Sequence, residues 1–491
     1  MTARRFSALG AALLLSACVQ GPDYKAPEPR IADAWVAQAG AGQVTDAPWW
    51  QDLGDPMLGS LIDEMLATNP SLREAQARLA EARANRDAVR GGRLPQASVS
   101  ATGSENVLSK NGQLPIGSIP GFARDFSLFD FGFDASWEVD LWGKRVRENE
   151  AADARLQSAS LSVEGVRLQL IAELARAYVD LRQAQAELGL ASDVLAARQR
   201  LADLTDLRAK AGEASAIEAN RAYGDLESAR VAQSGAQAAV RGAALSVAVL
   251  VGKAPSEMLA RLEAPGALPE PPAAIAAGLP ADLLRRRPDI LGAERDLAAA
   301  TADIGVARAD LLPRLSLSLA LGQQARALGD LVDGDSTRLQ AGGGLFWPIF
   351  NGGRARALVR AADARAQGAA ARYDAAVIGA LADSEAAINR FDRSLVALAA
   401  ARAAAVRERA AYGLAEQRAR RGEDDQLVLA QGRLASLAAA RQEMQALASA
   451  TEASIALHKA LGGGWRPESR LAGAVEDARS SGRSDAGSSA R

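Results

Sequence analysis

Apolar and polar residues alternate between Phe129 and Leu141. Every second residue is apolar, and acidic side chains fill most of the places between them: Asp130, Asp134, Glu138 and Asp140. A period of two predicts a β-strand with one apolar and one polar face. Its length is that of a strand that crosses a membrane, about 9–11 residues. Gly143 ends the alternation, and the Ala-, Leu-, Glu- and Arg-rich segment that follows has the composition of a helix.

This helix is predicted to run without proline from Lys144 to about Lys210. Between Leu170 and Leu195 its apolar residues recur in alternating steps of four and three, which is the heptad pattern of a coiled coil. At 1.5 Å per residue, roughly 65 residues form a rod on the order of 100 Å long. Ala211-Gly212-Glu213 interrupts the rod, and a second helix is expected from about Ala214 to Val251.

The order of elements in residues 48–254 recurs in residues 280–465. Ala-Ala-Asp-Ala-Arg begins at 151 and 361, Gly-Glu at 212 and 422, and a closing Gly stands at 252 and 462, so each pair is 210 residues apart. Leu-Pro stands at 94 and 312, 218 residues apart, so the length difference falls in the loop of the hairpin. The sequence therefore predicts a duplicated unit of a helix, a β-hairpin and a long helical hairpin, with residues 255–279 as a connector.

Each copy of the unit supplies two strands. They are expected at 97–104 and 129–141 in the first copy, and around 315–321 and ending near Ile349 in the second. An open sheet with an apolar face cannot lie in lipid, because its edge amides would stay unpaired. Membrane barrels have at least about eight strands, so several chains must close one barrel around a water-filled lumen. For the strands alone, the alternative is a soluble sandwich; for the rods, it is a coiled-coil stalk.

The chain begins with the features of a signal peptide, predicted for residues 1–17. Arg4 and Arg5 precede a short apolar run that ends in Leu15-Ser16-Ala17-Cys18. This ending resembles a bacterial lipobox, in which the cysteine is acylated, so Cys18 is the predicted lipidation site. The alternative is a chance core cysteine. Residues 18–47, rich in Pro, Gly and Ala, are expected to form a lipid-anchored extended arm, and residues 466–491 a disordered tail.

Composition argues against several other classes of protein. The formal net charge of −2 gives no reason to expect nucleic acid, and no apolar run approaches the ~18 residues of a spanning helix. His458 is the only histidine and Cys18 the only cysteine, so Ser-His or Cys-His catalysis and most zinc sites have little to draw on. Gly342-Gly343-Gly344 is followed by no phosphate-loop Lys-Ser/Thr. We therefore expect no enzyme, no metal and no cofactor.

Short motifs spread over nearly the whole chain point to one family. Near the N-terminus they are Cys18 with Gly21-Pro22-Asp23-Tyr24, and Trp49-Trp50 with Asn69-Pro70-Ser71-Leu72. The most specific is Leu279 to Ile290 (LPADLLRRRPDI), followed by Ile304-Gly305-Val306-Ala307 and Leu312-Pro313-Arg314-Leu315. With these motifs the chain resembles the TolC-like outer-membrane efflux channels of Gram-negative bacteria, and among them the lipoprotein branch typified by the OprM and NodT families.

The resemblance implies the fold and the partners. It implies a homotrimer with a twelve-stranded transmembrane β-barrel, four strands from each chain, and a periplasmic α-barrel of long antiparallel coiled-coil helices. The fold class is thus an α+β membrane protein, set in outer-membrane lipid and extending into the periplasm. The expected partners are a periplasmic adaptor protein and an inner-membrane pump, of the RND type.

The family closes its tube at the periplasmic tip, where the helices return. In this chain the two turns are expected near Gly212 and Gly422. Gln431 stands where family members often carry an acidic residue, which leaves Asp424 and Asp425 as candidates for a carboxylate ring at the gate. Their alternative role is to cap the returning helix, where Asp is favoured. Farther along the tube, Asp130, Asp134, Glu138 and Asp140 are the candidates for lining the lumen.

The expected function is a passive exit duct for small molecules such as drugs and toxic compounds, in a tripartite efflux pump. One alternative is an export channel for secreted polypeptides of type I secretion, which uses the same architecture. Another is a lipid-anchored coiled-coil structural protein. The lipobox and the Trp49-Trp50 opening favour small-molecule efflux.

Overall fold

A computed structural model of the chain describes residues 19–37, 40, 42, 44, 47–109, 123–423 and 425–465. The predicted signal peptide, Cys18, Asp424 and the C-terminal tail lie outside the described residues. By its internal contacts the chain divides into two compact units. The first comprises Met1–Pro27, Ala80–Ser158 and Ala293–Arg372, and the second Glu28–Leu79, Ala159–Gly292 and Tyr373–Arg491. Each unit therefore draws on both halves of the sequence.

The folded part opens with a short 3₁₀ helix, Trp49–Leu53, followed by α2 (Pro56–Thr68) and α3 (Pro70–Gly91). Asp55 caps α2 by accepting hydrogen bonds from the backbone N–H groups of Met57 and Leu58. The two helices are separated at Asn69-Pro70. Pro70 cannot continue the hydrogen-bond ladder of α2, and Asn69 Oδ1 starts α3 by accepting from the N–H of Ser71 at 2.8 Å.

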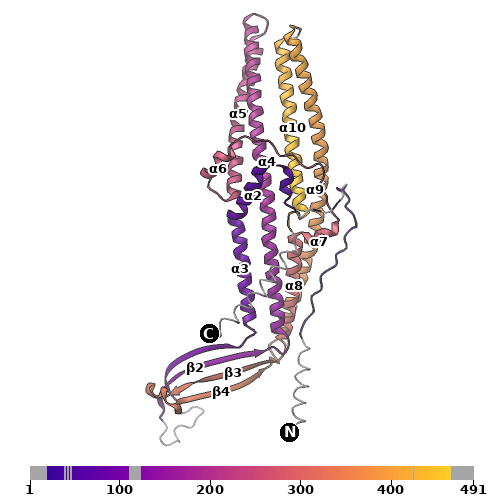
Figure 1. The fold of residues 1–491 in the computed structure, drawn as a ribbon. Helices are drawn as coiled ribbons and strands as arrows, with labels where there is room; N and C mark the ends of the chain where they lie inside the picture. Colours follow the sequence, from indigo (N-terminus) through magenta and orange to yellow (C-terminus); the bar gives the residue numbers. More distant parts are fainter. Residues whose placement is uncertain are drawn as a thin grey trace. The chain divides into compact units, whose positions relative to one another are not determined.

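Four long helices form the rods. They are α4 (Lys144–Lys210), α5 (Ala216–Val251), α9 (Arg354–Arg420) and α10 (Gln426–Ala460) (Figure 1). α4 and α9 have 67 residues each, and α9 begins and ends 210 positions after α4. Every heptad position from Leu170 to Leu195 is buried or half-buried. The first two long helices, predicted from Lys144 to about Lys210 and from about Ala214 to Val251, have ends correct to within two residues.

The connector between the halves holds a helix that the sequence analysis missed, α6 (Pro255–Leu262). Gly252-Lys253-Ala254-Pro255 indicates the end of a helix, but proline is also favoured in the first turn of a new one. Met258 and Leu262 of α6 are buried in the core of the second unit. Beyond it, α7 (Leu283–Arg286) and α8 (Pro288–Ala309) precede the second pair of strands.

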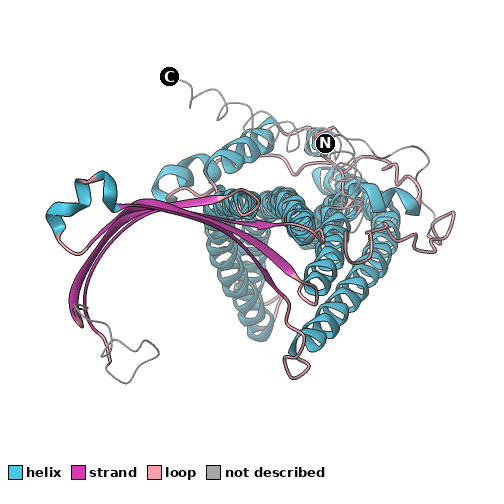
Figure 2. Cartoon of the chain, turned by 90° about the horizontal axis from the view of Figure 1, so that it is seen from below, coloured by secondary structure: helices cyan, strands magenta, loops and turns pink. Residues whose placement is uncertain are grey.

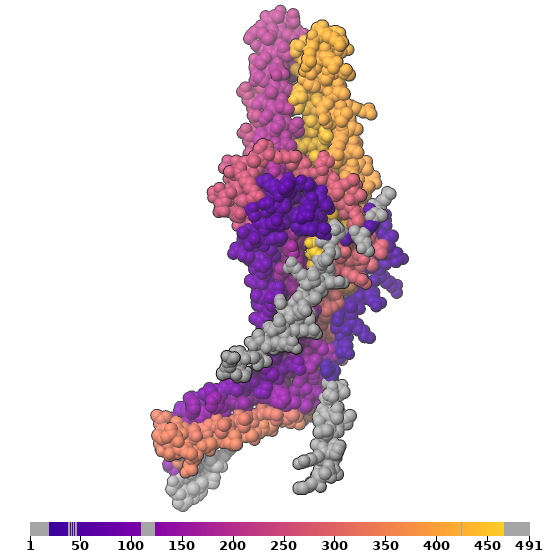
Figure 3. Space-filling view, viewed as in Figure 1, coloured from indigo at the N-terminus to yellow at the C-terminus, as the bar shows by residue number. Residues whose placement is uncertain are grey.

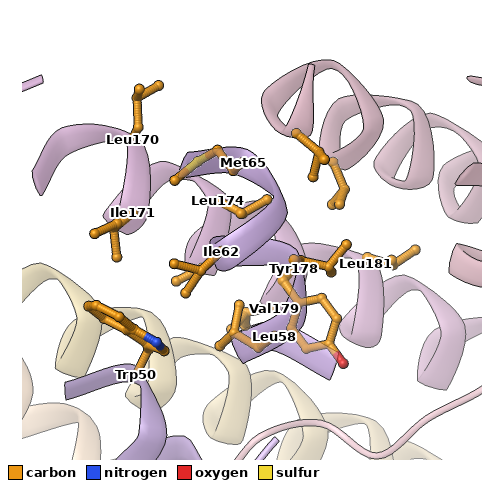
Figure 4. Packing of buried hydrophobic residues seen from close by; sticks show 14 of the residues in the cluster. Trp50, Leu58, Ile62, Met65, Leu170, Ile171, Leu174, Tyr178, Val179 and Leu181 are labelled. Carbon is orange, nitrogen blue, oxygen red and sulfur yellow. The ribbon is translucent and has the colours of Figure 1, made fainter. Parts of the chain in front are cut away.

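The core of the second unit forms where α2 lies against α4 (Figure 4). Leu58, Ile62 and Met65 of α2 are fully buried with Leu174 and Tyr178 of α4.

Among the described helices, α5 alone has an 18-residue stretch that is apolar enough to cross a membrane, with mean hydropathy 1.4. Its Ala244, Val247, Ala248 and Val251 lie in the same core as α2 and α4.

The first unit contains one four-stranded antiparallel sheet in the order β1-β2-β3-β4. The strands are β1 (Gln96–Val107), β2 (Asp125–Val139), β3 (Arg314–Ala325) and β4 (Thr337–Phe346). β2 pairs with β3, with Phe133 opposite Leu321, so the two halves of the sequence meet in the middle of the sheet. Figure 3 shows this as adjoining purple and orange bands.

Two predicted strand ends are corrected. β2 ends at Val139, so Asp140 and Leu141 lie beyond the strand. β4 ends at Phe346 rather than near Ile349, because Pro348 has no N–H to donate to a ladder.

Candidate functional site: a two-faced sheet and a helical tip

One face of the sheet is apolar and exposed. Residues directly opposite each other in an antiparallel sheet share a face, and the register places Phe133 opposite both Val99 and Leu321. Phe131 and Phe133 are 48% and 58% exposed. The other large exposed side chains of this face are Val99, Val107, Trp137, Leu317, Leu319, Leu321, Leu339 and Leu345. Such a face is what lipid selects on a membrane barrel.

The opposite face is polar, and its centre is Asp130. Arg338 of β4 donates to both carboxylate oxygens of Asp130, from Nε at 2.7 Å and from Nη2 at 2.6 Å. Gln324 of β3 donates a third hydrogen bond, at 2.8 Å. Three strands are therefore joined through one carboxylate. Asp130 was predicted from the alternation of the strand. Arg338 was missed, although it occupies a polar position of the alternating run Thr337-Arg338-Leu339-Gln340.

Gly132 and Gly322 face each other across β2 and β3. A Cβ atom on Gly322 would lie 2.4 Å from the carbonyl oxygen of Phe131, and one on Gly132 would lie 2.8 Å from that of Leu321. Only glycine permits this close approach of two backbones. The sheet curves strongly (Figure 2), and we attribute part of this curvature to the glycine pair.

The other predicted lining residues differ in their surroundings. Asp134 accepts a hydrogen bond from Ser100 Oγ at 2.7 Å on the polar face. Glu138 lies near the end of β2 and pairs with Arg145 at 3.4 Å. Asp140 lies past the strand, and its Oδ2 accepts from the backbone N–H of Val146 at 3.2 Å. This placement is that of a cap at the start of α4 and not of a strand residue.

The sheet has two open edges. β1 and β4 each pair with one neighbour only, within the part of the chain that the structure describes. Edge strands with unpaired N–H and C=O groups are a template for pairing with another strand. The sheet by itself is therefore incomplete as a membrane-embedded structure.

The second unit ends in two similar turns between long helices. Gly212 and Gly422 have φ angles of 81° and 73°, the left-handed conformation that glycine adopts at the C-terminus of a helix. After them, Ser215 forms a capping box with Glu218 at the start of α5, and Asp425 caps α10. Both breaks were predicted at these glycines.

Asp425 does two things at this tip. Its Oδ1 accepts from the N–H of Leu427 at 3.2 Å, and its Oδ2 lies 3.5 Å from Arg208 Nη1 at the end of α4. The carboxylate therefore caps its own helix and links the two helical turns. Gln431 lies one and a half turns farther along α10 and is exposed. Nothing in the sequence pattern singled out Arg208, because the contact joins residues 217 positions apart.

Within the described ranges, no group of three or more His, Cys, Asp and Glu side chains is placed to hold a metal ion. The arrangement of the sheet and the long helices is typical of a class of proteins and does not indicate a particular reaction. A curved sheet with one exposed apolar face, one polar face and two open edges, continued along the chain by coiled-coil helices, defines a subunit of a membrane channel.

Comparison with known proteins identifies the class. The family profile "Outer membrane efflux protein" matches residues 61–253 and 279–463. The chain is 33% identical to outer membrane protein OprJ of Pseudomonas aeruginosa over 469 residues, 94% of this chain and 95% of that protein. It is 30% identical over 476 residues to the toluene efflux pump outer membrane protein TtgF of Pseudomonas putida, covering 94% and 97%. The solved structure of the outer-membrane channel OprN matches with a TM-score of 0.81 and 34% identity, covering 91% of this chain and all of that one.

The chain thus belongs to the outer membrane efflux protein family. It is an outer-membrane efflux channel of the TolC-like type, located in the outer membrane. The resemblance deduced from the sequence motifs is confirmed. The family is one of channels, not of enzymes.

Proposed function

We propose that three copies of this chain form a passive exit duct for small molecules, embedded in the outer membrane as a twelve-stranded barrel and continued into the periplasm by the long helices. The observation that carries this proposal is the two-faced sheet with its two open edges. Pairing β4 of one copy with β1 of the next satisfies those edges, and three sheets of four strands exceed the minimum of about eight strands for a membrane barrel.

The polar face then lines a wet lumen through Asp130, Asp134 and their partners. A wide water-filled bore selects its cargo weakly, so specificity belongs to the pump that feeds it. The similarity over nearly the full length to the toluene efflux protein supports small molecules rather than polypeptides as cargo. The adaptor and the RND-type inner-membrane pump that complete a tripartite system remain part of this proposal.

The equal lengths and constant spacing of α4 and α9 support an origin by internal duplication. Two copies of a helix, hairpin and rod in each chain, and three chains, give a ring with six similar parts. This arrangement suits a tube, because each rod packs between two neighbours of similar shape.

Single-channel conductance tests whether the protein forms a duct across a membrane. The purified full-length protein, added to a planar lipid bilayer, is expected to give discrete single-channel steps at neutral pH. A matched sample that has been heat-unfolded serves as the control. A correctly folded preparation that never conducts would contradict the proposal and would favour a structural stalk. Chemical crosslinking in detergent checks the trimer separately, with a ladder that stops at three copies.

The proposed role of Asp424 and Asp425 at the periplasmic tip can be tested separately. We propose that Asp425, with Asp424, contributes carboxylates to the closed periplasmic end of the tube. Replacing both residues by Ala is expected to lower the preference of the channel for cations and to raise its open probability, since the contact with Arg208 is lost. Asp425→Asn alone retains much of the capping geometry without the charge. If cation preference is unchanged in both variants, Asp425 is only a helix cap.

Lipidation of Cys18 is a further part of the proposal. Cells fed radioactive palmitate are expected to label the wild-type protein and to leave Cys18→Ser unlabelled. Retention of label in Cys18→Ser would refute the assignment.

A further inference from the structure

The segment that joins β4 to α9 exposes large apolar side chains. Ile349 and Phe350 are 85% and 91% exposed, and Trp347 is 54% exposed. Three arginines follow at once on the first two turns of α9: Arg354, Arg356 and Arg360. All three are exposed. We call residues 347–360 the second junction.

The charges of the second junction are uncompensated within the described part of the chain. None of the three arginines forms an ion pair there, and the first carboxylate along α9, Asp363, lies against Arg308 at 4.0 Å. Arg356 and Arg360 are four residues apart and share one face of α9, whereas Arg354 lies two residues before Arg356 and projects from another face. Basic side chains that directly follow exposed aromatic and aliphatic residues in the chain favour a ligand that is anionic at one end and apolar at the other.

The first junction, residues 137–150, lies 210 positions earlier and differs in its charges. Its basic side chains are all paired: Lys144 with Asp310 at 2.7 Å, Arg145 with Glu148 at 2.9 Å, and Arg147 with Glu150 at 2.7 Å and Asp23 at 2.6 Å. At the positions of Glu148 and Glu150 the second junction has Leu358 and Arg360. The acids that neutralise the first junction are thus replaced in the second.

The backbones of the two junctions are nevertheless alike. Trp137 and Trp347, 210 positions apart, each donate the indole N–H to a carbonyl at 3.0 Å, of Arg93 and of Leu311 respectively. Gly143 and Gly353 also correspond and have φ angles of 71° and 81°. The two junctions therefore share a local backbone structure but differ in the charge of their surfaces.

The first junction is covered by the N-terminal arm. A Cβ on Gly143 would lie 2.8 Å from Cγ1 of Val19, and Gln20 donates its N–H to the carbonyl of Trp142 at 3.0 Å. Around the corresponding Gly353, a Cβ would meet no atom within 4 Å among the described residues. The arm thus covers the first junction, whereas within the single chain no described residue covers Gly353 of the second.

We propose that the second junction binds an anionic phospholipid of the outer membrane, with the phosphate held by Arg356 and Arg360, positive charge added by Arg354 at the start of α9, and the acyl chains lying against Ile349 and Phe350. The strand that leads into the junction has an apolar face for lipid, so the junction lies where the hydrocarbon region ends. A free anion would leave the apolar side chains in water, and an uncharged lipid would leave the arginines unpaired. The proposal does not depend on acylation of Cys18.

Native mass spectrometry tests this site. The full-length protein is delipidated in dodecyl maltoside and titrated with dioleoylphosphatidylglycerol or with zwitterionic dioleoylphosphatidylcholine. The wild type is expected to bind phosphatidylglycerol more tightly. Replacing Arg354, Arg356 and Arg360 together by Gln should weaken phosphatidylglycerol binding on the order of 100-fold, about fivefold for each arginine, and change phosphatidylcholine binding little. Ile349→Ser with Phe350→Ser should weaken both lipids alike.

The matched control removes three exposed arginines elsewhere, Arg73, Arg200 and Arg407, in one variant. An equal loss of phosphatidylglycerol in this control would overturn the proposal, since it would reflect net charge alone. Displacement of the lipid by 10 mM inorganic phosphate would also overturn it, in favour of a simple anion site. A triple variant that dissociates the oligomer but keeps its lipid would assign the junction to a contact between subunits and contradict the lipid site. The conductance test above is independent of all these outcomes.

Discussion

Arg338 reaches over Gly322 to hold Asp130 with two hydrogen bonds of 2.6 and 2.7 Å. The two residues lie on β4 and β2, and the strand between them carries no side chain at the crossing point, because Gly322 stands opposite both Gly132 and Arg338. A planar guanidinium matches a carboxylate in this two-bond geometry. The sheet is therefore fastened across three strands on its polar face.

Asp130→Asn should loosen this fastening. Both partners are partly shielded from water, with side-chain exposures of 27% for Arg338 and 14% for Asp130, so we expect a measurable loss in the free energy of unfolding. The measurement is the temperature at which the folded band disappears in semi-native electrophoresis. Ser100→Ala, which removes only a neutral hydrogen bond to Asp134, is the control and should have the smaller effect. Equal effects would mean that the ion pair adds nothing.

Gly322→Ala should be more damaging than loss of the ion pair. The new methyl group would lie 2.4 Å from the carbonyl oxygen of Phe131 and 2.7 Å from the Cα of Gly132, so two backbones must separate. We expect a loss of more than about 3 kcal/mol, or failure to assemble. Gly344→Ala on β4, whose Cβ would lie 3.5 Å from Ser316 Oγ, should be tolerated. Normal assembly of Gly322→Ala would show that the strands can move apart freely.

His458 should make the second unit sensitive to acid. Its ring stacks on Trp49 with centroids 5.1 Å apart, and burial lowers the pKa of His458 to about 4. The folded state therefore holds a neutral ring, while the unfolded chain binds a proton near pH 6.5. The stability that depends on the neutral ring is complete above pH 6.5. It declines as the pH falls toward 4, by about 3 kcal/mol in total.

Unfolding temperatures at pH 7.0 and pH 4.5 measure this effect, compared between wild type and His458→Gln. Since His458 is the only histidine in the chain, the difference between the two proteins isolates its titration from that of the carboxylates. The variant should be less stable at pH 7.0 and should lose less on acidification. Parallel losses in both proteins would contradict a buried neutral ring.

Tyr178→Phe should destabilise the core of the second unit. The hydroxyl group donates to Asp55 Oδ2 at 2.5 Å and accepts from Arg182 Nε at 2.9 Å, and burial raises the pKa of Tyr178, which keeps the hydroxyl protonated. Removing it leaves a carboxylate and a buried guanidinium each short of a partner, at a cost of about 1–3 kcal/mol. Thermal unfolding followed by circular dichroism measures the loss. Tyr412→Phe keeps the ring that faces Arg433 and should be nearly neutral.

The sequence by itself determined the strands with one apolar face, the long helices, the glycine turns and the family. These features follow from local periodicity, from single glycine or proline residues that end an element, and from short motifs. They do not depend on which segments of the chain pack against each other. Even so, Pro348 ended β4 early, and Asp140 became a cap of α4 once β2 ended at Val139.

Only the tertiary structure decided which distant side chains meet. The pairing of β2 with β3 brings Arg338 to Asp130, and the approach of two helical turns brings Arg208 to Asp425. No sequence period encodes a contact between residues some 200 positions apart. The difference in cover between the two junctions also emerges only in three dimensions, because the arm that covers the first comes from residues more than 100 positions away. Local sequence patterns determine the individual helices, strands and turns, whereas packing determines which of them lie in contact.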